Sequence, residues 1–350
     1  MKMTFRWYGD SDPVTLEHIR QIPKMSGVVT ALYSIPVGEV WDEASILAQK
    51  KKCNDKGLEM EVIESVPVHE EIKLGSPERD RYIENYKTTI RNLGHAGVKV
   101  ICYNFMPVFD WVRSELKYVT EDGSNCLAYR QATVDKLDPN KTTLSLPGWD
   151  ESYTHEQLQG LLARYREVDA EQLFRNMVYF LKQLMPVCEE CDVKMAVHPD
   201  DPPWSLFGLP RIISTGEGID RLFREVDTVY NGITFCTGSL GADRHNDLPT
   251  LAARYARAGR VHFVHARNIK FADDESGLFF HEAPHPTECG SLDIYAILKA
   301  LHDNGFDGYI RPDHGRNIWG EDGRPGYGLF DRALGACYLN GLWEGIHKAK

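Results

Sequence analysis

Eight short apolar segments alternate with longer amphipathic segments along this chain of 350 residues, and this alternation limits the folds open to it. The short segments are rich in β-branched and aromatic residues, as strands are. The longer ones repeat apolar residues every three or four positions, as helices do. Alternating strands and helices form parallel sheets, and eight such units predict one closed (β/α)₈ barrel. The predicted strands are residues 4–9, 27–33, 59–65, 98–105, 193–199, 232–238, 260–267 and 308–315.

The clearest helical patterns lie between these strands and at the end of the chain. They cover residues 41–57, 77–97, 168–191, 291–305 and 330–349. An open doubly wound sheet is the alternative fold. That fold is favoured when Gly-x-Gly-x-x-Gly follows the first strand, and this chain has no such motif there. The closed barrel is therefore the prediction.

Extra length is concentrated in loops that follow strands. We expect a single domain, 1–350, with an insertion at about 106–168 after the fourth strand. The insertion predicts a hairpin at 116–134, a Pro/Trp stretch (LPGWD, 146–150) and a short helix at 156–166. Other long loops follow the fifth strand (199–210) and the seventh (266–290). In (β/α)₈ barrels, the loops after the strands carry the active site.

Charge and composition argue against several classes of protein. The net charge of −11, without a basic cluster beyond the predicted surface lysines at 50–52, disfavours nucleic acid as a partner. No apolar run is long enough to cross a membrane. The N-terminal residues MKMTFRWYGD lack an apolar signal region, so the expected location is the cytoplasm. The eight cysteines, several within apolar runs, are expected to be buried thiols rather than disulfides.

The last four strands each end in a residue that can bind a metal. These residues are His198, Cys236, His265 and Asp313. Because the strand ends of a barrel surround one mouth, two imidazoles, a thiolate and a carboxylate are predicted to meet there. Thiolate and imidazole suit zinc, iron or cobalt, and carboxylate also suits manganese, so the ligand set leaves the metal open.

Other metal-binding residue types in the chain are interpreted as structural. His262 lies three positions before a predicted ligand, so on a strand it points to the opposite face. Cys188 and Cys191 form a CxxC pair, but no second pair is spaced for a zinc site. The motif HEAPHPTEC (281–289) also contains metal-binding residue types, and its proline-rich context favours an ordered lid.

Further candidates surround the expected metal. His314 follows Asp313 directly and could act as a general acid or base, or support the metal. Arg267, Arg311 and Arg316 flank the ligands, and a guanidinium suits a substrate carboxylate or a neighbouring acidic residue such as Asp200 or Asp201. Tyr327, after a Pro-Gly turn, could transfer a proton over the mouth or simply pack.

Seven motifs, in this order, resemble the mannonate dehydratase family of the xylose-isomerase-like barrel type. They are ESVPVHEEIKLG, ICYNFMPVFDW, AVHPDDPP, FCTGSLG, VHARNIK, RPDHGRNIWGE and GYGLFDRALGACYL, and the resemblance runs from residue 5 to about 345. It implies a (β/α)₈ barrel, Mn²⁺ or Fe²⁺, and dehydration of D-mannonate to 2-keto-3-deoxy-D-gluconate in hexuronate (glucuronate) catabolism. The chain does not resemble the enolase-type barrel that catalyses the same reaction with acidic metal ligands.

The resemblance implies the same four metal ligands that the strand ends indicate, and it implies catalytic roles for His314 and Tyr327. We expect Arg267 or Arg316 to bind the substrate carboxylate. Asn104 and Glu64, at the ends of the fourth and third strands, are expected to contact substrate hydroxyls. A lyase that forms a homodimer is the resulting expectation.

Three other functions share some of these features. A metal-dependent sugar isomerase or epimerase on the same barrel would use similar ligands without losing water. A sugar-acid binding protein would not need an acid and a base. A metal-dependent phosphodiesterase or endonuclease usually gathers more carboxylates around several metals, and the acidity of this chain disfavours DNA.

Overall fold

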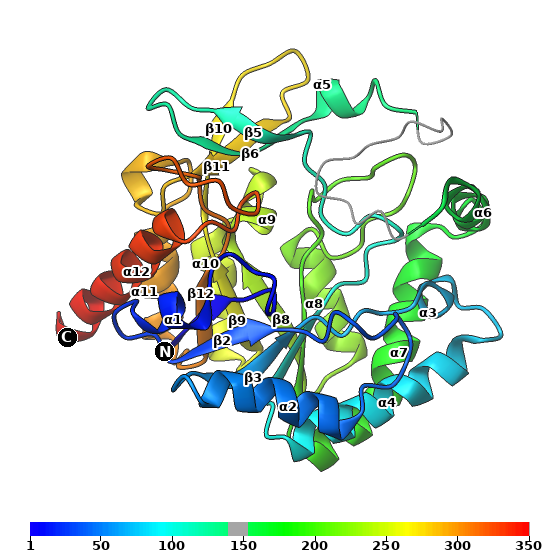
Figure 1. Cartoon of the computed structure of the whole chain (residues 1–350). Coiled ribbons are helices and arrows are strands. Elements are labelled where there is room, and N and C mark those ends of the chain that lie inside the picture. The colour runs from blue at the N-terminus through cyan, green and yellow to red at the C-terminus, as the bar shows by residue number, and fades with distance from the viewer. Residues whose placement is uncertain (139–152, 350) are drawn as a thin grey trace.

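The structure is a computed structural model that describes residues 1–138 and 153–349. Eight parallel strands close into a barrel in the order β1-β12-β9-β8-β7-β4-β3-β2 (Figure 1). Each strand overlaps a segment predicted to be one, so the predicted barrel is confirmed. The strands are β1 Lys2–Arg6, β2 Gly27–Thr30, β3 Glu59–Glu64, β4 Val100–Tyr103, β7 Lys194–Val197, β8 Asn231–Cys236, β9 Val261–Ala266 and β12 Tyr309–Pro312.

Helices surround the barrel (Figure 1). Their starts follow from local sequence, because several begin after an aspartate whose carboxylate accepts a backbone N–H of the first turn. Asp42, Asp169 and Asp293 accept in this way from residues 45, 172 and 296, over 2.8, 2.7 and 2.9 Å. The helices around the barrel are α1 Leu16–Arg20, α2 Glu43–Asn54, α3 Glu70–Leu74, α4 Arg79–His95, α7 Ala170–Cys191, α8 Gly216–Glu225, α9 Thr237–Ala242, α10 Leu248–Arg257, α11 Ile294–Asp303 and α12 Phe330–Lys348.

The core has two parts. A large cluster fills the space around the strands. Helix α7 contributes one apolar face to it, on which four residues recur and are fully buried: Leu173, Met177, Phe180 and Leu184. A smaller cluster, contributed by strand residues alone, includes Val62, Phe263 and Tyr309, and it fills the barrel interior. The barrel is therefore a solid support for the side chains at its mouth.

A second sheet covers one end of the barrel (Figure 1). We call it the cap sheet; it is antiparallel, with the order β10-β11-β6-β5. Its strands are β5 Glu115–Val119, β6 Asn125–Arg130, β10 Asn268–Ala272 and β11 Phe279–Ala283. The predicted hairpin is confirmed as β5 and β6, while the ribbon of β10 and β11 in the seventh loop was not predicted. Pairing of β6 with β11 joins the insertion after β4 to the long loop after β9.

The predicted insertion also contains helices. α5 Gln131–Val134 follows β6, and α6 His155–Tyr165 corresponds to the predicted short helix. The Pro/Trp stretch at 146–150 lies outside the described residues. The seventh loop ends in a 3₁₀ turn, η1 Thr287–Cys289. All eight cysteines are free thiols, as predicted. Five are buried, but Cys191 is partly exposed and Cys289 and Cys337 are exposed, so the prediction of burial is wrong for these three.

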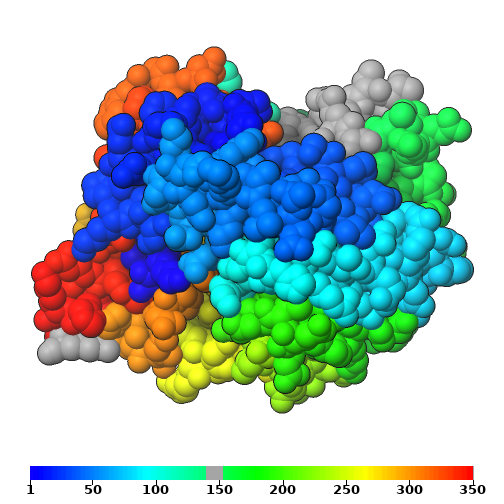
Figure 2. Space-filling model, turned by 60° about the horizontal axis from the view of Figure 1, so that its bottom comes forward, coloured from blue at the N-terminus to red at the C-terminus, as the bar shows by residue number. Residues whose placement is uncertain are grey.

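The outer helices follow one another around the barrel. Figure 2 shows α2, α4 and α7 as neighbouring blue, cyan and green bands. Early and late parts of the chain lie side by side, because β1 pairs with β12 and Lys24 Nζ lies 3.3 Å from Glu344 Oε2 of α12. Across the two described ranges, each helix is too short or too polar to span a bilayer.

Candidate metal centre and active site

The four predicted metal ligands meet at the mouth of the barrel. Cys236 and His265 lie in β8 and β9 and are register partners, while His198 and Asp313 follow β7 and β12 directly; these four strands are neighbours in the barrel. Ligand atoms of His198, Cys236 and His265 all lie within 4.8 Å of one another. Asp313 completes the group, with Oδ1 3.9 Å from His265 Nδ1 and Oδ2 3.7 Å from Cys236 Sγ. This is the arrangement that the strand ends predicted.

The thiol of Cys236 is set up to ionise. Burial raises its pKa, but Arg267 and the hydrogen bonds with His198 and His265 outweigh burial and hold the pKa well below the usual value of a thiol. The backbone N–H and the hydroxyl of Ser239 also donate to Sγ, over 3.4 and 3.0 Å. A thiolate is the form of cysteine that binds metals.

His198 has one nitrogen oriented for a ligand. Its Nδ1–H donates to the carbonyl of Pro199 over 2.7 Å, which leaves Nε2 to face the group. Burial lowers the pKa of His198, but the neighbouring Cys236 outweighs burial and raises it to about 9. Without a cation, the imidazolium and the thiolate would pair. A bound metal would replace that proton, as metals do at histidine and cysteine ligands.

Unsatisfied buried atoms support a cation at this position. Among the described residues, Asp313 Oδ1 and His265 Nε2 are buried and make no hydrogen bond of good geometry, although buried polar atoms nearly always do. Their contacts are ion pairs instead, Oδ1 with Arg311 Nη1 at 2.7 Å and Nε2 with Glu64 Oε2 at 3.2 Å. Burial raises the pKa of Asp313, but Arg311 and His314 outweigh burial and hold it well below the usual range, so the carboxylate is ionised. The donor set therefore fits a divalent metal.

A second group of possible ligand atoms shares His265 with the first. It adds Glu64 and Cys102. Burial raises the pKa of Cys102 well above that of a free thiol, and Arg311 Nη2 lies 3.0 Å from Glu64 Oε1. The protonated thiol makes this group the poorer metal site; the pairing of Glu64 does not distinguish the two groups, because Asp313 also pairs with Arg311, over 2.7 Å. Glu64 still lies beside the quartet, with Oε2 3.2 Å from His265 Nε2.

The two predicted proton carriers contact each other beside Asp313. His314 Nε2 lies 3.0 Å from the hydroxyl of Tyr327 and 3.9 Å from Asp313 Oδ1. Burial, followed by the neighbouring Tyr8, raises the pKa of Tyr327 well above its usual value, so the phenol stays protonated at neutral pH. Both side chains are buried, which keeps their mutual contact out of bulk water.

A glycine turn sets the position of Tyr327. Gly326 has φ +78°, and a Cβ there would lie 2.5 Å from the side chain of Leu127 in β6. Its carbonyl accepts the N–H of Gly315, just after His314, over 2.9 Å. A larger residue at 326 would separate the last loop from the cap sheet and move the phenol away from the imidazole.

The two arginines predicted to bind the substrate carboxylate are engaged by protein carboxylates. Arg267 is fully buried, with Nη1 2.5 Å from Glu282, Nη2 2.8 Å from Asp201 and Nε 3.0 Å from Asp313. Arg316 pairs with Asp331 and Asp122 over 3.0 and 2.6 Å. Of the two roles considered for Arg267, binding of a substrate carboxylate or pairing with an acidic residue such as Asp201, the structure shows the pairing with Asp201.

Asn104 lies just after β4 and is half-buried, and its side chain hydrogen-bonds with that of Asp110.

The residues interpreted as structural in the sequence, which are His262, the CxxC pair and the HEAPHPTEC motif, lie apart from the four candidate metal ligands. Burial lowers the pKa of His262 to about 3, as expected for a neutral core imidazole. Within the described part of the chain, the groups with metal-binding spacing include neither the CxxC pair nor His281, His285 or Cys289.

One charged residue of the site was missed in the sequence. Glu282, on β11 of the cap sheet, is fully buried and lies 3.0 Å from His314 Nδ1. It also accepts from Arg113 Nη2 over 3.3 Å, and Arg113 pairs with Asp201 over 2.8 and 3.0 Å. The sequence signal is the HEAPHPTEC motif, in which Glu282 directly follows His281.

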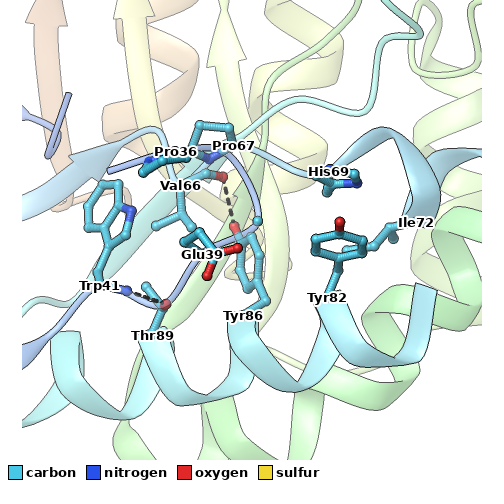
Figure 3. Close-up of a pocket in the computed structure, with 11 residues that line it drawn as sticks. Pro36, Glu39, Trp41, Val66, Pro67, His69, Ile72, Tyr82, Tyr86 and Thr89 are labelled. Atoms are coloured by element: carbon cyan, nitrogen blue, oxygen red, sulfur yellow. Dashed lines mark hydrogen bonds between the residues drawn. The ribbon is translucent and has the colours of Figure 1, made fainter. Parts of the chain in front are cut away.

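A small cavity lies away from this centre (Figure 3). It is enclosed by the loops after β2 and β3 and by α4, with Tyr82 stacked on His69 at 3.7 Å between ring centroids. Its volume of about 10 Å³ admits roughly one water molecule. This cavity is too small for a substrate.

The closed barrel and the side chains at its mouth define a class: a (β/α)₈-barrel enzyme with a candidate metal centre and an adjoining acid–base pair. Comparison with known proteins identifies the family. The model of the D-mannonate dehydratase (UxuA) family matches residues 1–350. The chain belongs to this family, which makes it a hydro-lyase and confirms the resemblance seen in the seven motifs.

Relatives match along the whole chain. A mannonate dehydratase of Thermotoga maritima is 56% identical and covers 100% of this chain and 99% of its own length. Mannonate dehydratase 2 of Halalkalibacterium halodurans is 54% identical, with 99% of each chain covered. The crystal structure of mannonate dehydratase from Streptococcus suis serotype 2 has a TM-score of 0.92 and 47% identity, and covers 100% of this chain and 95% of its own.

More distant structures share only the fold. A structure of L-ribulose 3-epimerase has a TM-score of 0.57 at 13% identity and covers 100% of this chain and 97% of its own. Its likeness supports the barrel and carries nothing about the reaction.

Proposed function

We propose that this chain removes water from D-mannonate to form 2-keto-3-deoxy-D-gluconate, with Mn²⁺ or Fe²⁺ held by His198, Cys236, His265 and Asp313. The observation that carries the proposal is the contact of His314 with Tyr327. His314 Nε2 lies 3.0 Å from the hydroxyl of Tyr327 and 3.9 Å from Asp313 Oδ1. It supplies a base and an acid beside the metal group. Full-length similarity to mannonate dehydratases supports the choice of substrate.

The metal centre would supply Lewis-acid chemistry. When bound, a divalent cation withdraws electron density from substrate oxygens and makes the hydrogen on carbon 2, next to the carboxylate, more acidic. The four protein ligands carry a thiolate and a carboxylate. Mixed hard and soft ligands of this kind are compatible with Mn²⁺ or Fe²⁺.

The proton transfers follow from the protonation states of the pair. The Nδ1–H of His314 donates to Glu282, so Nε2 has the free electron pair that accepts the proton from carbon 2. Tyr327 is a neutral phenol and donates a proton to the hydroxyl that leaves carbon 3 as water. The resulting enol gains a proton at carbon 3 and becomes the 2-keto product. Protons and electrons balance without an external oxidant or reductant.

Other groups near the mouth would position the sugar acid. Glu64 lies beside His265 and can accept a hydrogen bond from a substrate hydroxyl through Oε2, which has no hydrogen bond of good geometry among the described residues. Asn104, half-buried after β4, can do the same from the neighbouring strand. Arg267 or Arg316 could bind the carboxylate only by giving up one of its present ion pairs.

The deciding experiment incubates the metal-loaded protein with D-mannonate and its epimers and measures the 2-keto-3-deoxy acid. We expect product from D-mannonate, and a loss of at least about 100-fold in kcat in His314→Asn, the scale of general acid–base catalysis. Metal content should be unchanged in His314→Asn, because the imidazole of His314 is not one of the proposed metal ligands. Formation of an isomer or epimer without loss of water, or near-normal turnover in His314→Asn, would contradict the proposal.

The cellular setting is proposed on the same basis. The reaction would serve hexuronate catabolism in the cytoplasm, where small sugar acids are degraded. A homodimer is the proposed assembly, and sedimentation equilibrium of the full chain measures its mass.

A further inference from the structure

Three donors converge on one oxygen of Glu282. Oε1 lies 3.0 Å from His314 Nδ1, 2.5 Å from Arg267 Nη1 and 3.3 Å from Arg113 Nη2. The residue belongs to β11 in the cap sheet, whereas His314 follows β12 of the barrel. The cap sheet therefore places a carboxylate directly behind the imidazole that faces Tyr327.

This carboxylate is ionised and cannot donate. Burial raises its pKa, but Arg267 and His314 outweigh burial and lower it. An ionised carboxylate only accepts hydrogen bonds. His314 must therefore present Nδ1–H to Glu282, and in the neutral ring this leaves Nε2 without a proton on the side of Tyr327. The hydrogen bond at one ring nitrogen thus decides the chemistry of the other.

The carboxylate is itself held in place. Arg113 and Arg267 are both fully buried, and both also pair with Asp201, so two guanidinium groups are fixed between two carboxylates. The ring of Trp111 lies 5.3 Å from that of His314 between centroids and limits rotation of the imidazole. With its acceptor and one face fixed, His314 has little freedom to turn.

We propose that Glu282 is a positioning residue for His314: it fixes the Nδ1-protonated tautomer and directs Nε2 towards Tyr327 and the substrate. This inference rests on the proposed function, in which Nε2 of His314 is the base that accepts the proton from carbon 2. It makes the cap sheet a part of the catalytic apparatus, contributed by the loop between β9 and α11. A purely structural role is the alternative, in which Glu282 serves only as counter-charge for Arg113 and Arg267.

Two substitutions separate these roles. Glu282→Met removes the acceptor altogether. Glu282→Gln keeps an acceptor, because the two arginines donate to the position of Oε1 and will hold the amide oxygen there. Asp201→Asn is the matched control, since it removes counter-charge from the same two arginines but does not contact His314.

The tautomer is read by ¹⁵N NMR of histidine in the full chain loaded with diamagnetic Zn²⁺, at a pH where the ring is neutral, with His314→Asn assigning the signal. We expect Nδ1–H in the wild type, Glu282→Gln and Asp201→Asn, and a mixture of tautomers in Glu282→Met. With the activating metal, Glu282→Met should lose at least about 100-fold in kcat with little change in KM, and Glu282→Gln should recover part of it.

The outcomes distinguish the two proposals. An unchanged tautomer in Glu282→Met, or a fall in kcat equal in Glu282→Met, Glu282→Gln and Asp201→Asn, would overturn the positioning role. Absence of dehydration by the wild type would refute the proposed function instead, while the tautomer measurement would still report on Glu282. If Glu282→Met does not fold, Glu282→Leu and the difference between Glu282→Gln and Asp201→Asn decide the matter.

Discussion

Replacing Arg267 by methionine removes one guanidinium from between three buried carboxylates. Asp201, Glu282 and Asp313 lie 2.8, 2.5 and 3.0 Å from its nitrogens, and the arginine side chain is fully buried. Removing one partner of a buried ion pair typically costs about 3–5 kcal/mol, because the remaining charges are left unpaired. With about 2.1 cal/mol/K of unfolding entropy per residue, a chain of 350 residues should then melt about 4–7 °C lower.

Arg316→Met is the matched comparison. Arg316 has one exposed partner, Asp122 (58% exposed), and one buried partner, Asp331, so its loss should cost less than that of Arg267, about 1–3 kcal/mol. Both variants are measured by calorimetry with metal bound, together with KM for D-mannonate. If Arg267→Met melts within about one degree of the wild type and only KM rises, then Arg267 binds the substrate carboxylate and its structural role is refuted.

Three further predictions concern the proton donor, the metal and a core histidine. Tyr327→Phe keeps the ring but loses the 3.0 Å hydrogen bond, so kcat should fall at least about 100-fold while stability falls by only about 1 kcal/mol; comparable losses in both would contradict its role as an acid. Chelation should abolish turnover and lower Tm, and Mn²⁺ or Fe²⁺ should restore both; full activity after complete removal of metal would exclude a metal-dependent reaction. Burial lowers the pKa of His262 from 6.5 to about 3, so unfolded chains take up the proton first and stability falls as the pH drops from 6.5 towards 3; His262→Gln should flatten this part of the Tm–pH curve, and a parallel curve would refute the reasoning.

The barrel could be predicted because its signals are local. Each strand is a short apolar run with loop residues on both sides, and helices such as α7 show an apolar face in the sequence itself. The convergence of the four candidate metal ligands could be predicted for the same reason, since each stands at the end of a strand whose direction is fixed by the fold. Parallel strands in one barrel must bring such residues to one mouth.

The cap sheet and Glu282 could not be predicted in this way. The register that pairs β11 with β6 joins Phe279 to Arg130, and nothing local in either segment specifies the other. The partners of Arg267 likewise come from different loops, Asp201 after β7 and Glu282 in β11. A charged residue at a strand end can serve a substrate or another side chain, and only the three-dimensional arrangement distinguishes the two.

The closure of the barrel by β1 and β12 has a consequence for biosynthesis. Lys2 and Met3 are made long before their partners Tyr309 and Ile310, about 300 residues further along the chain. Asp313, His314 and Tyr327 follow β12, so three of the proposed metal ligands are made well before the fourth and before both proton carriers. A nascent chain could therefore collect a metal with an incomplete set of ligands, but it could not begin to turn over substrate until β12 and the loop that follows it have been made.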